Sequence, residues 1–344
     1  MLIYTLKRIL LMVPTLLGAL TIVFIVVQFV PGGPVEQIMA EARAAGGGSE
    51  GGYRASRDVD KQQIEELKKL YGFDKPAHVR YVEMLADFAR FDLGKSFMQN
   101  KDVWTLIKEK LPVSVSLGLW SFLLAYLVSV PLGIAKAVRE GSRFDTLTTL
   151  LVLVGYAIPG FVLGILLIVL FAGGSFYDVF PLRGLTSDDW VEMSWPARIA
   201  DYFWHLALPL VCLTIGSFAA TTMLTKNTFV EEIRKQYVLV ARAKGLSQQR
   251  VLYKHIFRNA LIPLVTGFPA AFIGAFFAGS VLIETLFSLD GLGLLGYEAV
   301  IRRDYPVVLG SLYFFTLIGL VVKLVSDLLY RVVDPRVQFG SVAR

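Results

Sequence analysis

Gly94-Lys95-Ser96 is a short stretch of this 344-residue chain that resembles part of a nucleotide-binding motif. It matches the end of the phosphate-binding loop G-x-x-x-x-G-K-S, in which backbone N–H groups, the lysine and the serine hold phosphates and Mg²⁺. The first glycine of that loop would stand at position 89, where this chain has Ala89. The stretch therefore predicts no nucleotide site, and we expect the chain to carry no cofactor of its own.

The other reactive side chains are dispersed along the sequence. His78, His205 and His255 lie far apart, and Cys212 is the single cysteine, so spacing suggests neither a disulfide nor a metal-ligand cluster. The motifs H-E-x-x-H, C-x-x-C and G-x-S-x-G do not occur. We predict no catalytic residue and no metal site, which argues against an enzyme.

The composition is typical of a protein that crosses a membrane several times. Hydrophobic residues make up 55% of the chain and charged residues 18%. Six stretches are long and apolar enough to cross about 30 Å of hydrocarbon as helices; they are residues 9–30, 113–135, 147–172, 204–225, 261–283 and 307–330. Because backbone groups in lipid must pair within their own segment, we predict an all-α integral membrane protein with six transmembrane helices.

Basic residues concentrate in the segments before the first stretch and after the second, fourth and sixth. These segments hold 16 Lys and Arg residues and five acidic residues. By the positive-inside rule they are cytoplasmic, together with both termini. The net charge of +6 is then explained mostly by the basic residues of the cytoplasmic segments, and no nucleic-acid partner is expected.

The chain divides into three predicted regions. Residues 1–30 are the N-terminus and an uncleaved first transmembrane helix. Residues 31–112 are a small helical subdomain outside the membrane, with a flexible glycine-rich loop at 44–52 and a helix that starts after Pro76. Residues 113–344 form a core of five transmembrane helices with a cytoplasmic loop at 226–260.

The loop 226–260 carries eight basic residues, each of which would cost roughly 2.5–3.5 kcal/mol in lipid. Its first helix is broken by Gly245, and Ser247 is a suitable N-cap for a second helix. The apolar positions of the first helix are Ile233, Tyr237, Val240 and Ala241. Two interpretations remain open on physical grounds: contact with anionic lipid headgroups, or docking of a partner protein.

The same loop resembles a known docking element. Ala241-Arg242-Ala243-Lys244-Gly245-Leu246, followed by His255, Arg258 and Asn259, is similar to the loop by which permeases of ABC-type peptide importers engage their ATPases. The general pattern E-A-A-x-x-x-G is met in part, because Leu239-Val240-Ala241 stand at the E-A-A positions. Peptide-type permeases resemble this chain in that departure.

Further stretches along the chain resemble landmarks of dipeptide and oligopeptide permeases. They are Val30-Pro31-Gly32-Gly33-Pro34, Gly72-Phe73-Asp74-Lys75-Pro76, Asp92-Leu93-Gly94-Lys95-Ser96, Gly155-Tyr156-Ala157-Ile158-Pro159, Glu284-Thr285-Leu286-Phe287-Ser288 with Gly291-Leu292-Gly293, and Arg303-Asp304-Tyr305-Pro306-Val307-Val308. The glycine-rich loop and the P-G-G-P after the first stretch are most similar to permeases of oligopeptide importers that also admit the peptide antibiotic microcin C.

The resemblance implies a function and a set of partners. The chain would be the permease subunit of a bacterial inner-membrane importer that moves oligopeptides from periplasm to cytoplasm. Its partners would be a second homologous permease, two ATPase domains that bind ATP and Mg²⁺, a periplasmic peptide-binding protein, the peptide and membrane lipid. The implied ATPase-coupling residues are Tyr237, Ala241, Arg242, Ala243, Lys244, Gly245, Leu246, His255, Arg258 and Asn259. Dipeptides or nickel within the same family, and an ion-coupled secondary transporter outside it, are the alternatives.

Four residues are candidates for a translocation path. Tyr156 and Pro159 lie in the third apolar stretch, where a proline frees a carbonyl group and bends the helix. Gly274 and Ala278 belong to a row of small residues in the fifth. Close helix packing explains both features as readily as a substrate path does.

Overall fold

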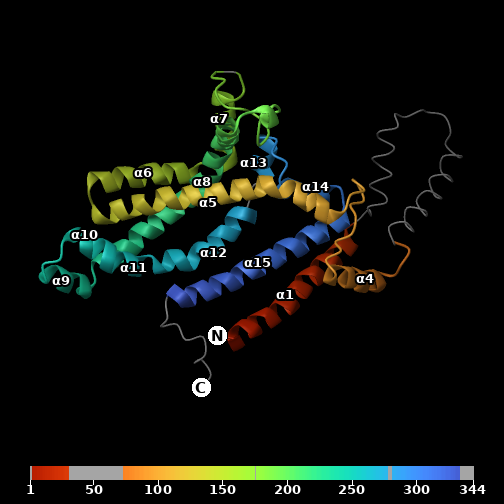
Figure 1. The fold of residues 1–344 in the computed structure, drawn as a ribbon, viewed down its shortest axis with the longest axis horizontal. Helices are drawn as coiled ribbons and strands as arrows, with labels where there is room; N and C mark the ends of the chain where they lie inside the picture. The colour runs from red at the N-terminus through yellow and green to blue at the C-terminus, as the bar shows by residue number, and fades with distance from the viewer. Residues whose placement is uncertain (1, 31–72, 175, 278–280, 334–344) are drawn as a thin grey trace. The chain divides into compact units, whose positions relative to one another are not determined.

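The computed structural model describes residues 2–30, 73–174, 176–277 and 281–333, and within these ranges the chain is helical, with no β-strand. Four helices there are long and apolar enough to span a membrane by length and composition. They are found in α1 (Leu2–Phe29), α5 (Val103–Val138), α8 (Trp195–Ile233) and α15 (Tyr305–Val333) (Figure 1). The first, second, fourth and sixth predicted stretches are thereby confirmed as long apolar helices.

The third predicted stretch, 147–172, is two helices. α6 (Arg143–Ala157) and α7 (Gly160–Phe171) meet at an angle of 92°. Ile158 has extended backbone angles, φ −88° and ψ 117°, because the ring of a following proline disfavours the helical conformation. The predicted bend is present, but the expectation of one continuous helix is wrong, and the pair is either a broken span or a re-entrant loop.

The fifth predicted stretch, 261–283, corresponds to α12 (Ile262–Phe277) and α13 (Val281–Leu286). Residues 278–280 between them lie outside the described residues. Counting the bent pair as one span, the described residues contain up to five candidate spans. The count of six therefore stays a prediction.

The chain forms two compact units. The first contains residues 1–111 and 294–320. In it α4 (Ala77–Ala89) begins directly after Pro76, as predicted, and buries Phe88. Tyr81 of α4 packs against Phe24 of α1 with ring centroids 5.2 Å apart. The glycine-rich loop 44–52 and most of the predicted subdomain lie outside the described residues.

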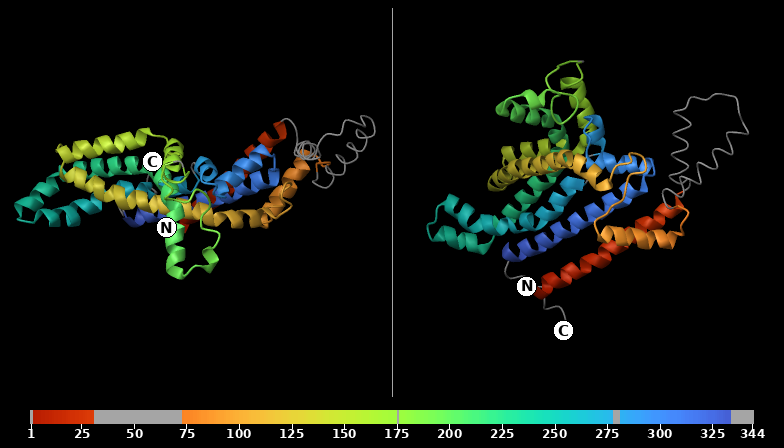
Figure 2. Two further views of the ribbon diagram at one scale, coloured as in Figure 1. Left: turned by 90° about the horizontal axis from the view of Figure 1, so that it is seen from above. Right: turned by 45° about the vertical axis from the view of Figure 1, so that its right-hand side comes forward.

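The second unit contains residues 112–293 and 321–344. α5 and α6 are joined by a short turn and run side by side, and α6 and α7 both pack on α8 (Figures 1 and 2). Small residues allow these close approaches. A Cβ atom added to Gly160 of α7 would lie 2.6 Å from the carbonyl oxygen of Cys212, and one added to Gly133 of α5 would lie 2.6 Å from Cβ of Thr225.

Candidate functional site

The predicted basic loop is a folded element that follows α8, and we call residues 234–260 the basic hairpin. It consists of α9 (Gln236–Ala243), α10 (Gln248–Arg250), a π-helical turn (Val251–Ile256) and α11 (Phe257–Ala260). Gly245 has φ +79°, a left-handed conformation that glycine adopts without strain. Ser247 caps the second half by accepting a hydrogen bond from Arg250 N at 3.4 Å. The predicted break and the predicted cap are both confirmed.

The basic hairpin is attached to the long helices α5 and α8 through an apolar core. Val238 is fully buried and Ala241 nearly so, and they pack with Val251, Ile256 and Ala260 against Phe229 of α8 and Ala137 of α5. Burial of such side chains is the main force that holds a short helix in place. The basic hairpin is therefore part of the second unit's packed structure.

The prediction that Val240 belongs to the apolar face of the first helix is wrong, because Val240 is 53% exposed. Its spacing from Ile233 assumed a continuous helix, whereas Lys235 has extended angles, φ −73° and ψ 149°, between α8 and α9. The helical phase restarts there, so Val238 rather than Val240 points into the core, while Ala241 is buried as predicted. The short run Val238-Leu239-Val240 offered no signal for choosing the buried position.

The first turn of α9 is fixed by polar contacts with the end of α8. Tyr237 donates a hydrogen bond from its hydroxyl group to Glu232 Oε2 at 2.7 Å, and Lys235 pairs with the other oxygen of that carboxylate. Burial raises the pKa of the Tyr237 phenol, which keeps it protonated as a donor. Tyr237 thus positions α9.

The outer surface of the basic hairpin combines apolar and cationic side chains. Leu239, Val240 and Tyr253 are 60%, 53% and 63% exposed. Exposed cationic side chains accompany them: Arg242, Lys244, Arg250, Lys254 and Arg258. Of the other predicted coupling residues, Ala243, Gly245 and Asn259 are exposed, Leu246 and His255 are half-buried, and Ala241 is buried. The fold brings the predicted coupling residues together on one small element.

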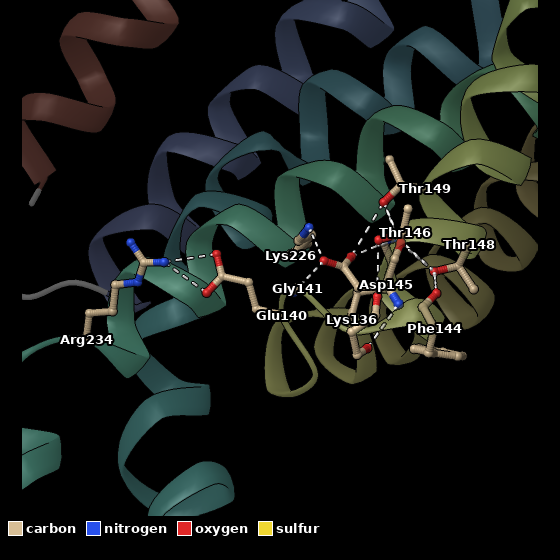
Figure 3. Close-up of polar contacts among 11 residues, drawn as sticks. Lys136, Glu140, Gly141, Phe144, Asp145, Thr146, Thr148, Thr149, Lys226 and Arg234 are labelled. Carbon is tan, nitrogen blue, oxygen red and sulfur yellow. Dashed lines mark hydrogen bonds and ion pairs between the residues drawn. The ribbon is translucent and has the colours of Figure 1, made fainter.

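A set of ion pairs, which we call the ionic clamp, joins α5, α6 and α8 beside the basic hairpin (Figure 3). It consists of Lys136, Glu140, Asp145, Lys226 and Arg234. Its inner part is two ion pairs that share the buried carboxylate of Asp145: Asp145 Oδ2 lies 2.7 Å from Lys226 Nζ, and Asp145 Oδ1 lies 3.2 Å from Lys136 Nζ. Its outer pair is exposed, with Arg234 Nη2 lying 2.9 Å from Glu140 Oε2 and 3.0 Å from Glu140 Oε1.

Every donor of the Lys136 ammonium group is used inside the protein. Lys136 is fully buried and donates to the Asp145 carbonyl group at 2.9 Å, to Thr148 Oγ1 at 2.9 Å and to Thr149 Oγ1 at 2.6 Å. Buried charges persist when they are paired and hydrogen-bonded in this way. The sequence predicts these residues only as charges that set the topology, and it does not predict the ionic clamp as a whole. The position of Asp145 at the start of a helix was indicated by the sequence, since Ser142 and Asp145 have capping-box spacing. The contact of Asp145 with Lys226 was not indicated by any spacing in the sequence.

The four candidate path residues come from different parts of the chain. Tyr156 is 60% exposed near the end of α6, and Pro159 directly precedes α7. Gly274 lies in α12, and Ala278 lies outside the described residues. Their shared role stays a prediction.

Comparison with known proteins identifies the family. The pattern of the family described as binding-protein-dependent transport system inner membrane component matches residues 129–339. The peptidoglycan transport system permease protein YejB of Agrobacterium fabrum is 53% identical over 356 residues, covering 98% of each chain. The inner membrane ABC transporter permease protein YejB of Escherichia coli O157:H7 is 52% identical over 358 residues, again covering 98% of each chain.

More distant relatives and a solved structure also point to ABC importer permeases. The di/tripeptide transport system permease protein DppB of Pseudomonas aeruginosa is 32% identical over 349 residues, covering 98% of this chain and 99% of its own. A solved structure of the methionine ABC transporter MetNI, in an inward-facing conformation, shares the fold with a TM-score of 0.51 and 17% identity, covering 67% of this chain and 97% of that chain. The resemblance to ABC importer permeases is confirmed, and the secondary-transporter alternative is excluded. This chain belongs to the family of inner-membrane components of binding-protein-dependent transport systems.

Proposed function

We propose that this chain is the permease subunit of an ATP-driven importer that carries oligopeptides from the periplasm to the cytoplasm, and that the basic hairpin is where the ATPase docks. The observation that carries the docking proposal is the surface of the basic hairpin. Leu239, Val240 and Tyr253 face outward although the hairpin has a core of its own that could bury apolar side chains. Exposed apolar side chains on the same short element as five exposed cations favour a protein surface with apolar pockets and acidic rims.

The alternative occupant of that surface is the anionic lipid headgroup layer, which attracts basic residues by about 1 kcal/mol each. Lipid attraction explains the five cations but gives no reason for a fixed turn at Gly245 or for the polar contacts that orient Tyr237. A rigid, oriented element suits a partner that pushes on it. The basic hairpin is therefore assigned to the ATPase, and ATP and Mg²⁺ would be bound there rather than in this chain.

The proposed cargo rests on the relatives. Their names specify peptidoglycan, di- and tripeptides, and oligopeptides, all of which contain peptide units. Two relatives, at 53% and 52% identity, are YejB proteins, one of them named for peptidoglycan transport. These names favour peptides over nickel. Oligopeptides, and peptide antibiotics of the microcin C kind, are proposed over dipeptides from the sequence resemblance, since the relative named for di- and tripeptides is only 32% identical.

The family name supplies the remaining partners as proposals. A binding-protein-dependent system has a binding protein, here proposed to be periplasmic and to select the peptide. A second permease subunit would complete the channel, and two ATPase domains, fused or separate, would drive it. With the basic hairpin on the ATPase side, both termini are proposed to be cytoplasmic.

Pro159 and Tyr156 are proposed to line or gate the path. The 92° break between α6 and α7 interrupts the helical hydrogen-bond ladder, and irregular backbone in a membrane is tolerated where it is buried in protein or lines a water-filled cavity. Gly274 and Ala278 are proposed to lie on the same path.

The test is reconstitution of the importer in proteoliposomes. The chain would be co-expressed with the proteins encoded beside it, and uptake of a labelled oligopeptide, a dipeptide and Ni²⁺ would be measured with and without ATP. We expect ATP-dependent oligopeptide uptake. Val240→Asp should reduce copurification of the ATPase by roughly tenfold or more, since a buried unpaired charge at an interface is costly.

Val191→Asp is the matched control, because Val191 is 73% exposed in a short 3₁₀ turn away from the basic hairpin. It should leave ATPase binding unchanged. Normal ATPase recovery with Val240→Asp would refute docking at this surface, and uptake of Ni²⁺ or dipeptides alone would refute the proposed cargo.

A further inference from the structure

The ionic clamp is placed between the basic hairpin and the break in the α6–α7 pair. Lys226 lies in the last turns of α8, and Arg234 is the residue that follows α8, two positions before the start of α9. Asp145 stands in the first turn of α6, whose other end is Ala157 at the break. Lys136 and Glu140 belong to the end of α5 and the turn that follows it. The five residues therefore join the base of the basic hairpin to α6 (Figure 3).

We infer that the ionic clamp makes α6 move together with the basic hairpin, so that a displacement produced by the ATPase reaches the 92° break before Pro159. Asp145 and Lys226 are then positioning residues for the coupling of ATP hydrolysis to transport. The inference rests on the proposed function, in that an ATPase moves the basic hairpin. The inference goes beyond the proposed function by naming the contacts through which a movement of the basic hairpin displaces α6.

Three observations support this path. The Asp145–Lys226 pair is short and largely buried, with the two side chains 7% and 16% exposed, so water screens it little. The carboxylate of Asp145 also accepts a hydrogen bond from Gly141 N at 3.2 Å, which ties the α5–α6 turn to the same group. α6 otherwise contacts α8 through apolar side chains around Gly155, where a Cβ atom would lie 3.3 Å from Ile215. Apolar contacts resist separation but permit sliding, whereas a buried ion pair fixes the register.

Lys226→Met is the informative variant. It removes the ion pair between α6 and α8 and leaves Asp145 paired with Lys136, so the remaining carboxylate is not stranded. In the reconstituted complex we expect peptide uptake per ATP hydrolysed to fall roughly tenfold, in the range of ordinary coupling between sites. ATP hydrolysis itself and ATPase recovery should stay close to wild type. Lys226→Arg keeps the charge and should retain coupling. A role for the methylene chain alone would instead leave Lys226→Met, which keeps most of that chain, as well coupled as wild type.

An exposed ion pair outside the ionic clamp supplies the matched control. Lys101→Gln breaks the contact with Glu109 at the surface, where side-chain exposures of 51% and 44% leave the pair weak. It should change coupling by less than about twofold. The inference is overturned if Lys226→Met retains wild-type uptake per ATP, or if Lys226→Arg is as uncoupled as Lys226→Met.

A second measurement keeps the inference testable if Lys226→Met fails to assemble. In a Cys212→Ala background, spin labels at Leu150 of α6 and Glu231 of α8 measure the distance between the two helices that the ionic clamp joins. Labels at Leu150 and at Ile165 of α7 measure the distance across the α6–α7 break. All three sites are exposed. Between nucleotide-free and ATP-trapped complexes, the first distance should stay constant while the second changes. A first distance that changes as much as the second refutes the ionic clamp.

These labels respond to ATP whatever the cargo is. A wild-type complex that takes up no peptide but shows the expected distances would refute the proposed cargo and leave the ionic clamp standing. A complex that transports peptide with normal coupling in Lys226→Met would refute the ionic clamp and leave the proposed function standing.

Discussion

Ser96 donates a hydrogen bond from Oγ to Asp304 Oδ2 at 2.5 Å, which joins two segments 208 positions apart in the sequence. Both side chains are buried, at 2% and 3% exposure, and Asp304 Oδ1 also accepts a hydrogen bond from Phe97 N at 3.0 Å. Asp304 directly precedes α15, so this contact fastens the loop before α5 to the start of α15. The hydroxyl group that a phosphate-binding loop would offer to Mg²⁺ is committed here to a structural carboxylate.

Ser96→Ala should lower the free energy of unfolding by about 1–3 kcal/mol, because it leaves a buried carboxylate with one partner fewer. The measurement is thermal unfolding in detergent with a thiol-reactive dye, for which the buried Cys212 is a natural reporter. Lys95→Ala is the control, since Lys95 is exposed next to Ser96. It should leave both the unfolding temperature and ATP-driven uptake unchanged, whereas a phosphate-binding role for Lys95 would abolish uptake.

Gly291→Ala should destabilise the second unit. A Cβ atom at Gly291 would lie 2.6 Å from the carboxyl carbon of Glu284, and Glu284 is fully buried, so its carboxylate cannot swing into solvent. Overpacking of this kind costs about 1–3 kcal/mol. The same dye assay would detect it, with Gly296→Ala as control.

Gly296 lies in the helix α14 (Leu292–Ile301), and a Cβ atom there meets no atom within 4 Å. Alanine is favoured over glycine inside a helix by about 1 kcal/mol, so Gly296→Ala should be neutral or slightly stabilising. Equal unfolding temperatures for Gly291→Ala and the wild-type chain would show that Glu284 can move aside.

Local chemistry made part of this structure predictable. Gly245, Ser247 and the Ile158-Pro159 pair act on the backbone within a few residues, so the break, the cap and the bend could be predicted from type and order alone. The long apolar helices were predictable for the same reason, because lipid leaves the backbone no alternative.

Contacts between distant segments were not predictable. Ser96 with Asp304 and Lys226 with Asp145 pair residues that the fold brings together over 208 and 81 positions, and no local spacing encodes either contact. Val238 and Val240 show a second limit: one extended residue at Lys235 resets the helical phase, and their exposures become 0% and 53%. Such a reset depends on packing against α5 and α8 rather than on the sequence of α9.

Gly160→Ala tests the close approach of α7 to α8. The added Cβ atom would lie 2.6 Å from the backbone carbonyl oxygen of Cys212, and a backbone atom cannot rotate away as a side chain can. The helices must separate, at a cost of about 1–3 kcal/mol, and the Cys212 thiol should react faster with a maleimide in the folded protein. Gly216→Ala on α8 meets no atom within 4 Å and should leave the labelling rate unchanged. An unchanged rate with Gly160→Ala would contradict the α7–α8 packing.

Gly245→Pro should abolish ATP-driven uptake while leaving membrane insertion intact. Proline holds φ near −65°, which is incompatible with the +79° found at Gly245, and it removes the N–H group that donates to the Arg242 carbonyl group at 2.9 Å. Gly245→Asn is the matched variant, because asparagine tolerates the left-handed conformation and keeps the N–H group. We expect Gly245→Asn to retain most of the uptake and Gly245→Pro to retain none, with equal amounts of both chains in the membrane fraction. Equal uptake by the two variants would mean that the shape of the basic hairpin does not matter for coupling, since only the proline variant destroys the turn between α9 and α10.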